Sequence, residues 1–66
     1  MLDNNLYNLM TQMVEENHSL WRILNKYKQD AADCDCGECL AFWDKMVIDK
    51  EEHIKELEGL VKSHMK

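Results

Sequence analysis

The sequence predicts an all-α fold, in which two helices form an antiparallel hairpin that pairs with a second copy into a four-helix bundle. Two long segments carry apolar residues at helical spacing, and the chain has no proline to interrupt either of them. All three cysteines and one of the two glycines lie between these segments, in the stretch from Asp33 to Cys39. Helices joined by so short a connection must lie antiparallel, side by side.

The first helix is expected over about residues 3–32. Its apolar side chains recur at about 100° per residue and form one stripe: Leu2, Leu6, Met10, Met13, Leu20, Leu24 and Ala31. Asp3 or Asn4 can cap its start by accepting a hydrogen bond from a free amide of the first turn. Other apolar residues widen the stripe on both sides: Leu9, Ile23 and Tyr27 on one, Val14 and Trp21 on the other. So broad an apolar surface predicts two neighbouring helices.

A cysteine-rich corner over residues 33–38 leads into the second helix, expected over about residues 36–64. Asp35 is placed to cap this helix, and Glu38 three residues later completes a capping box. The apolar stripe comprises Cys39, Trp43, Met46, Leu57 and Val61, flanked by Phe42, Val47, Ile54 and Leu60. One hairpin would leave the flanking residues of both helices in water. We therefore predict a homodimer with two-fold symmetry.

Composition narrows the range of partners. Thirteen Asp and Glu against eight Lys and Arg give a net charge of −5, which argues against nucleic acid or an anionic membrane as partner. No apolar run of about 18 residues predicts a membrane-spanning helix, and no basic region followed by an apolar block predicts a signal peptide. A cytoplasmic location is therefore expected. The sequence contains no Ser-centred elbow, Gly-rich phosphate loop or His-Glu-x-x-His motif, so we predict no catalytic residues.

One layer in the middle of the predicted core is polar. It comprises Glu16 and Asn17 from the first helix and Asp49, Lys50 and His53 from the second. Each lies within its helix's apolar stripe or on the edge of it. A buried charge is costly unless it is paired. The layer is therefore an ion-pair network, a wet cavity or a metal site, and the sequence leaves these alternatives open.

Short motifs in both helices resemble the first helix pair of ferritin-like and rubrerythrin-like proteins. These motifs are Glu15-Glu16-Asn17-His18-Ser19-Leu20, Phe42-Trp43 and Glu51-Glu52-His53-Ile54. The resemblance implies a di-iron site with Glu16 as the carboxylate of the first helix and His53 as the histidine of the second. The bridging glutamate is replaced by Lys50, three residues before His53. Either the site is lost and Lys50 neutralises Glu16, or Asp49 substitutes as a ligand.

The cysteines predict a second site, at the corner. Cys34, Cys36 and Cys39 are close enough in sequence for three thiolates to bind one zinc or iron ion. The amino end of the second helix favours thiolates through its free amides. A fourth ligand is needed, and His64 of an antiparallel partner copy would complete a Cys₃His site. Because there is no fourth cysteine, a single ion is favoured over an iron–sulfur cluster.

Two other states of the same thiols stay open. Cys39 could form a reversible disulfide with Cys34 or Cys36, or all three thiols could be free.

The sequence thus predicts a homodimeric module that binds a metal or supports assembly. The alternatives are a thiol redox protein that uses Cys36 and Cys39, and a degenerate ferritin-like protein with a purely structural role. Oxidoreductases usually hold a Cys-x-x-Cys pair on a strand–helix scaffold beside a substrate groove, which a hairpin lacks.

Overall fold

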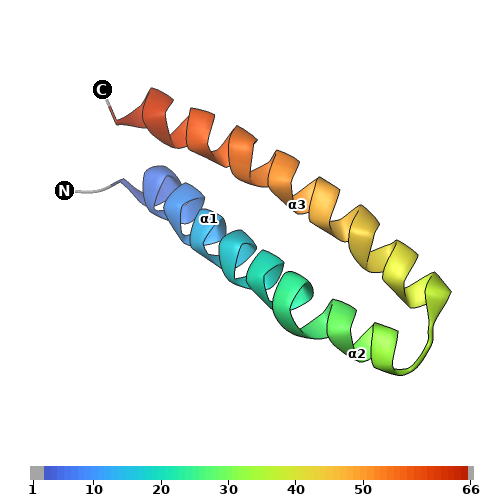
Figure 1. Cartoon of the computed structure of the whole chain (residues 1–66). Coiled ribbons are helices and arrows are strands. Elements are labelled where there is room, and N and C mark those ends of the chain that lie inside the picture. The colour runs from blue at the N-terminus through green and yellow to red at the C-terminus, as the bar shows by residue number, and fades with distance from the viewer. Residues whose placement is uncertain (1–2, 66) are drawn as a thin grey trace.

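The computed structural model describes residues 3–65 and shows a hairpin of two long helical arms (Figure 1). The first arm consists of α1 (Asn4–Arg22), a π-helical turn η1 (Ile23–Tyr27) and α2 (Lys28–Asp33), which follow one another without a break. The second arm is α3 (Gly37–His64). The predicted all-α class is confirmed for these residues, whereas Leu2, which the sequence placed on the first stripe, lies outside them.

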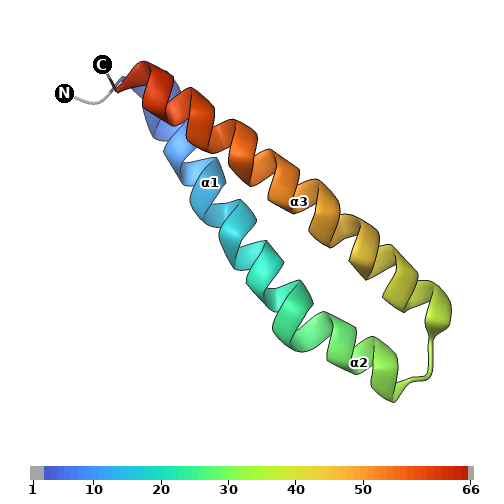
Figure 2. The same cartoon turned by 45° about the horizontal axis from the view of Figure 1, so that its top comes forward.

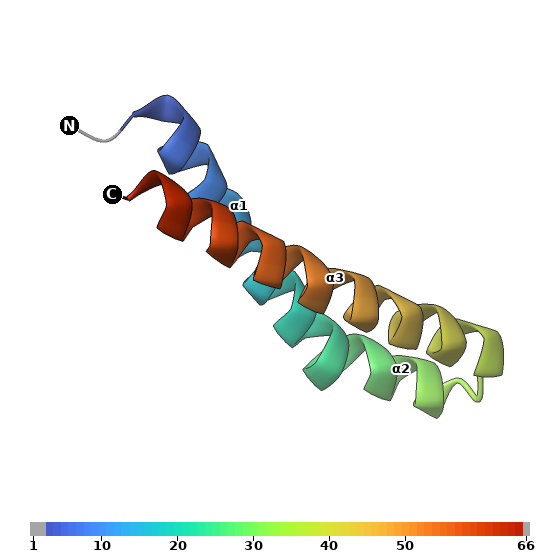
Figure 3. The same ribbon diagram turned by 90° about the horizontal axis from the view of Figure 1, so that it is seen from above.

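The hairpin is long and thin, with extents of 49 × 17 × 13 Å. The start of α1 and the end of α3 lie at one end, and the cysteine-rich corner lies at the other (Figure 2). Seen from above, the two arms cross (Figure 3). Asp3 caps α1, as the sequence predicted, because its Oδ1 accepts a hydrogen bond of 2.7 Å from the Leu6 amide.

The two arms pack along an inner seam of side chains spaced alternately three and four residues apart, the heptad pattern of helices that lie side by side. On the first arm the inner seam comprises Leu6, Leu9, Met13, Glu16, Leu20 and Ile23, the last of which belongs to η1. On α3 it comprises Leu40, Trp43, Val47, Lys50, Ile54, Leu57 and Val61. Ile23 is the most deeply buried large side chain, with 1% of its surface exposed. The seam therefore supplies most of the hairpin's apolar packing.

Part of the predicted stripes was wrong by one residue. Met10 and Leu24 are exposed, and Leu9 and Ile23 occupy the seam in their place. On α3, likewise, Cys39 is exposed, and Leu40, Val47 and Ile54 lie in the seam. The cause is a run of adjacent apolar pairs, which fits two stripes about 100° apart. The sequence pattern of one helix cannot distinguish the two stripes. Contact with the other arm determines which of them is buried.

The π turn shifts the seam by one residue. The Lys28 amide donates to the Ile23 carbonyl, five residues earlier, so one extra residue enters the helix. An unbroken heptad would bring Tyr27, Asp30 and Cys34 into the seam. Ala31 is buried there in their place, and Asp30 and Cys34 are exposed. The turn therefore keeps the Asp30 carboxylate out of the seam and rotates these three side chains to one side.

At the corner, Asp35 ends the first arm and does not cap the second. Asp35 has a φ of 55°, a left-handed conformation that Asp tolerates better than most residues. The Cys36 amide donates to the Ala31 carbonyl and the Asp35 amide to the Ala32 carbonyl, both at 3.0 Å. These two bonds form a Schellman motif, which satisfies the last carbonyls of α2. The predicted capping box is therefore wrong, and the cap of α3 is Cys36.

Candidate functional site

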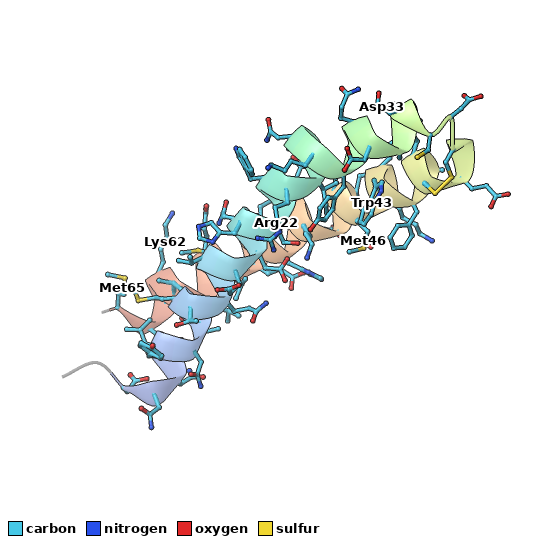
Figure 4. All side chains as sticks on the ribbon, turned by 90° about the horizontal axis from the view of Figure 1, so that it is seen from below. Arg22, Asp33, Trp43, Met46, Lys62 and Met65 are labelled. Atoms are coloured by element: carbon cyan, nitrogen blue, oxygen red, sulfur yellow. A yellow bond between two sulfur atoms is a disulfide. The ribbon has the colours of Figure 1, made fainter. Side chains whose placement is uncertain are left out.

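Cys36 and Cys39 form a disulfide at the start of α3, visible as the yellow sulfur–sulfur bond at the corner in Figure 4. Their Cα atoms are 5.3 Å apart, within the span that a disulfide bridges. The Cys39 amide donates to the Cys36 Sγ at 3.2 Å, so the Cys36 sulfur occupies the N-cap position. Cys34 is free and exposed. Of the three states that the sequence left open, the structure therefore contains the Cys36–Cys39 disulfide.

All three cysteines line one open groove between α2 and α3, with a volume of about 290 Å³. The residues that line this corner groove are Tyr27, Asp30, Ala31, Cys34, Cys36, Cys39 and Trp43. The ring centroids of Tyr27 and Trp43 lie 5.0 Å apart, and those of Trp43 and Phe42 5.1 Å apart. The sulfur atoms are thus set beside an apolar, aromatic wall. Tyr27, Asp30 and Cys34 reach the groove because the π turn has rotated them out of the seam.

His64, the fourth predicted ligand, is the last residue of α3. Twenty-seven residues of helix separate it from Gly37, which corresponds to about 40 Å. Within one chain, His64 therefore cannot meet the cysteines. With the disulfide closed, no three His, Cys, Asp or Glu side chains in residues 3–65 converge as a metal site. The predicted Cys₃His arrangement requires a partner chain and stays a prediction.

The polar layer centres on an ion pair between the two arms. The Lys50 ammonium lies 3.0 Å from the Glu16 Oε2, and the two side chains are 15% and 12% exposed. The Gln12 side chain donates to the Glu16 Oε1 at 3.1 Å, and the His53 Nδ1 lies 3.9 Å from the same oxygen. The hydrogen bond from Lys50 lowers the pKa of the Glu16 carboxyl and outweighs burial, which acts in the opposite direction. Glu16 is therefore a charged, paired carboxylate.

Asn17 and Asp49 do not belong to this layer, and His53, predicted within the core stripe, lies at its edge with its side chain 58% exposed. Asn17 and Asp49 are exposed, and the Asn17 side chain donates to the Met13 carbonyl of its own helix at 2.8 Å. Both residues lie one position away from the seam, Asn17 after Glu16 and Asp49 before Lys50. The prediction placed them in the core because it allowed for a broader stripe than the arms share. Of the alternatives that the sequence left open for this layer, the structure contains an ion pair in which Lys50 neutralises Glu16.

Comparisons with known proteins give no relative for this chain. No protein-family model matches it, and no curated protein or solved structure shows a significant similarity. The resemblance to ferritin-like and rubrerythrin-like proteins therefore stays a prediction. None of the helices in residues 3–65 is long and apolar enough to cross a membrane.

Asp30 and Tyr27 are the site residues that the sequence did not predict. Asp30 precedes Cys34 by four residues, a spacing that places two side chains on the same side of a helix. The sequence alone therefore indicates that Asp30 and Cys34 lie on the same side of the first helix. The π turn that brings both residues to the corner groove carries no sequence signature of its own, so their proximity to Cys39 and Trp43 could be seen only in the structure.

Proposed function

We propose that this chain is a small homodimeric helical protein whose corner performs reversible thiol–disulfide chemistry. One observation carries the proposal: Cys36 and Cys39 form a disulfide at the N-cap and third residue of a helix, in an open groove that they share with a third, free thiol. Helix N-termini stabilise thiolates, and an accessible disulfide exchanges with external thiols more readily than a buried one. The cytoplasm, where dithiol reductants are abundant, is the expected location.

The two cysteines differ in role. In the reduced protein, the Cys36 thiolate would accept the amide hydrogen bond that its sulfur already accepts from Cys39, which favours Cys36 as the nucleophile. Cys36 attacks one sulfur of a disulfide substrate, and the other sulfur leaves as a thiolate. The Cys39 thiolate then attacks the Cys36 sulfur and releases the second thiol. The substrate gains two electrons, and the Cys36–Cys39 pair becomes the disulfide; a dithiol reductant restores it by the reverse exchange.

The dimer is supported by the amount of surface that one hairpin leaves in water. The chain exposes 5171 Å². A folded monomer of its mass, 7.9 kDa, is expected to expose about 4,400 Å². The excess is close to the roughly 800 Å² that each partner buries in a protein–protein interface of standard size. A second copy of the chain is therefore the occupant that we propose for the exposed apolar surface.

The surface for this second copy lies on the first arm, along α1 and the start of η1. Each residue of an outer stripe follows a seam residue by one position: Tyr7, Met10, Val14, Asn17, Trp21 and Leu24. All six are exposed and five of them are apolar. A one-residue step turns a helix by about 100°, which is close to the right angle between the two neighbours of a helix in a four-helix bundle. Contact between the outer stripes of two copies would bring four helical arms together.

Two of the three large exposed apolar residues of α3 face the other way, whereas the third, Ile48, follows the seam residue Val47 and lies beside the outer stripe. Phe42 and Leu60 precede the seam residues Trp43 and Val61 by one position. Because α1 and α3 are both right-handed and run in opposite directions, a step forward on α1 and a step backward on α3 turn to opposite faces of the hairpin. Beside the outer stripe, α3 presents mainly charged side chains: Asp44, Glu51, Lys55, Glu58 and Lys62. This arrangement favours pairing through α1, with a charged rim beside it.

Counting reactive thiols tests the proposed chemistry. In protein exposed to a mild oxidant, one thiol is expected to react rapidly with a thiol reagent, and all three after a dithiol reductant is added. A chelator should change neither count in the oxidised protein. Cys34→Ser should remove the rapid reaction, because Cys34 is the exposed free thiol. Three rapidly reacting thiols in oxidised protein would contradict the proposal, since the Cys36–Cys39 bond would then not form.

A further inference from the structure

The corner groove also places one carboxylate beside the three sulfur atoms. Asp30 lines the groove together with Cys34, Cys36 and Cys39. The Asp30 carbonyl accepts the Cys34 amide at 3.1 Å, so these two residues lie one helical turn apart on the same side of α2. Of the other acids near the corner, Asp33 accepts a hydrogen bond from Gln29 at 2.9 Å and Asp44 pairs with Lys28 at 2.7 Å. Asp35 and Glu38 do not line this groove. Within residues 3–65, no hydrogen bond or ion pair engages the Asp30 carboxylate.

These four groups have the composition of a tetrahedral site. Zinc takes four ligands from cysteine sulfur, histidine nitrogen and carboxylate oxygen. In the oxidised chain two of the sulfur atoms are bonded to each other, and no metal site is formed in residues 3–65. Reduction by a dithiol adds two electrons and two protons to the disulfide and frees both sulfur atoms. Binding of Zn²⁺ then displaces the protons of the three thiols.

We propose that the reduced corner binds one zinc ion through Cys34, Cys36, Cys39 and Asp30 of a single chain, and that closure of the Cys36–Cys39 disulfide releases it. The inference rests on the proposed thiol chemistry for its switch, but the site itself requires only the reduced cysteines. It replaces the predicted partner His64 with Asp30, which the chain itself supplies. The π turn gains a role as well, because it moves Asp30 and Cys34 from the seam to the groove.

Competition with a chromophoric zinc chelator tests the site. The reduced protein is expected to take one equivalent of zinc per chain, with an affinity at least 100-fold higher than that of the oxidised protein. Asp30→Asn should weaken binding about tenfold or more. Asp35→Asn is the matched control, because it removes the same charge beside the cysteines at a left-handed position that Asn also tolerates. It should bind zinc like the wild type, as should His64→Ala.

Cobalt(II) gives a second readout. Each thiolate adds intensity to the sulfur-to-cobalt charge-transfer bands in the ultraviolet. Asp30→Asn is expected to retain this intensity at saturating cobalt, whereas Cys34→Ser should lose about one third of it.

Equal zinc affinity in the reduced and oxidised protein would overturn the proposal, as would equal weakening by Asp30→Asn and Asp35→Asn, or loss of binding in His64→Ala. If the reduced protein binds no zinc but the thiol counts hold, the site fails and the thiol chemistry stands. If the reduced protein binds zinc but no disulfide forms on oxidation, the zinc site stands, whereas its release by oxidation and the thiol chemistry fail.

Discussion

Replacing Trp21 with glutamate is expected to convert a dimer of about 16 kDa, twice the 7.9 kDa chain, into a largely unfolded monomer. Trp21 lies near one end of the outer stripe of α1, with 56% of its surface exposed in the single chain. A carboxylate there would have to lose its water when two outer stripes meet, which is costly even with Arg22 and Lys26 beside it. Folding and association are coupled in so small a core, so loss of the dimer also lowers the population of folded chains.

The matched control is Leu60→Glu. Leu60 is similarly exposed, at 48%, but it lies on α3 and turns to the opposite face of the hairpin. This variant should remain a dimer with nearly unchanged thermal stability. Sedimentation equilibrium and circular dichroism measure both effects. A wild-type protein that sediments as a folded monomer at micromolar concentration would show that the outer stripe is not an interface.

Lys50→Met is expected to lower the free energy of unfolding by about 2–3 kcal/mol. Removal of one member of a buried ion pair costs about 3–5 kcal/mol, whereas an exposed pair contributes at most about 1 kcal/mol. The Glu16–Lys50 pair lies between these limits and nearer the buried one, with side chains 12% and 15% exposed. The double change Glu16→Leu with Lys50→Met should recover most of the loss, because no charge is left unpaired. Identical urea midpoints for the wild type and Lys50→Met would contradict the pairing.

The same ion pair gives a pH dependence with a defined sign. Because Lys50 lowers the pKa of folded Glu16 below its usual value of 4.5, Glu16 binds a proton more readily in the unfolded chain. Its contribution to stability is therefore complete above the unfolded pKa and is lost as pH falls through the folded pKa. In Glu16→Gln this part of the acid destabilisation should be absent, so its stability relative to the wild type should improve as the pH falls below 4.5.

Much of the fold could be predicted from the sequence because its signals are local. Helical spacing without proline defines both arms, and the clustered cysteines mark the corner. The Glu16–Lys50 ion pair was one of the alternatives that the sequence left open, because a charge among apolar side chains is costly unless it is paired. The sequence did not predict which face of each arm packs in the inner seam. Adjacent apolar pairs such as Leu9-Met10 and Ile23-Leu24 fit two stripes equally well, and only the packed partner distinguishes them.

The corner was harder to predict, for two physical reasons. Asp35 has the chemistry of a helix cap, but it is also tolerated in the left-handed conformation that ends α2, and the structure uses the second property. The cap of α3 then falls to Cys36, a residue that is not a typical N-cap. The sequence therefore shows where the thiols lie. It does not determine whether they are metal-bound, disulfide-bonded or free, and it does not place Asp30 beside them.

Equilibration of the protein in glutathione buffers of increasing oxidised fraction, followed by thiol trapping and peptide mass analysis, tests the central claim most directly. The account predicts one two-electron transition that converts Cys36 and Cys39 from dithiol to disulfide within the range of these buffers, while Cys34 forms no bond within the chain. If the trapped peptides show no Cys36–Cys39 disulfide even in the most oxidising buffer, the proposed thiol–disulfide chemistry is wrong. The same holds if the disulfide persists unchanged in the most reducing buffer.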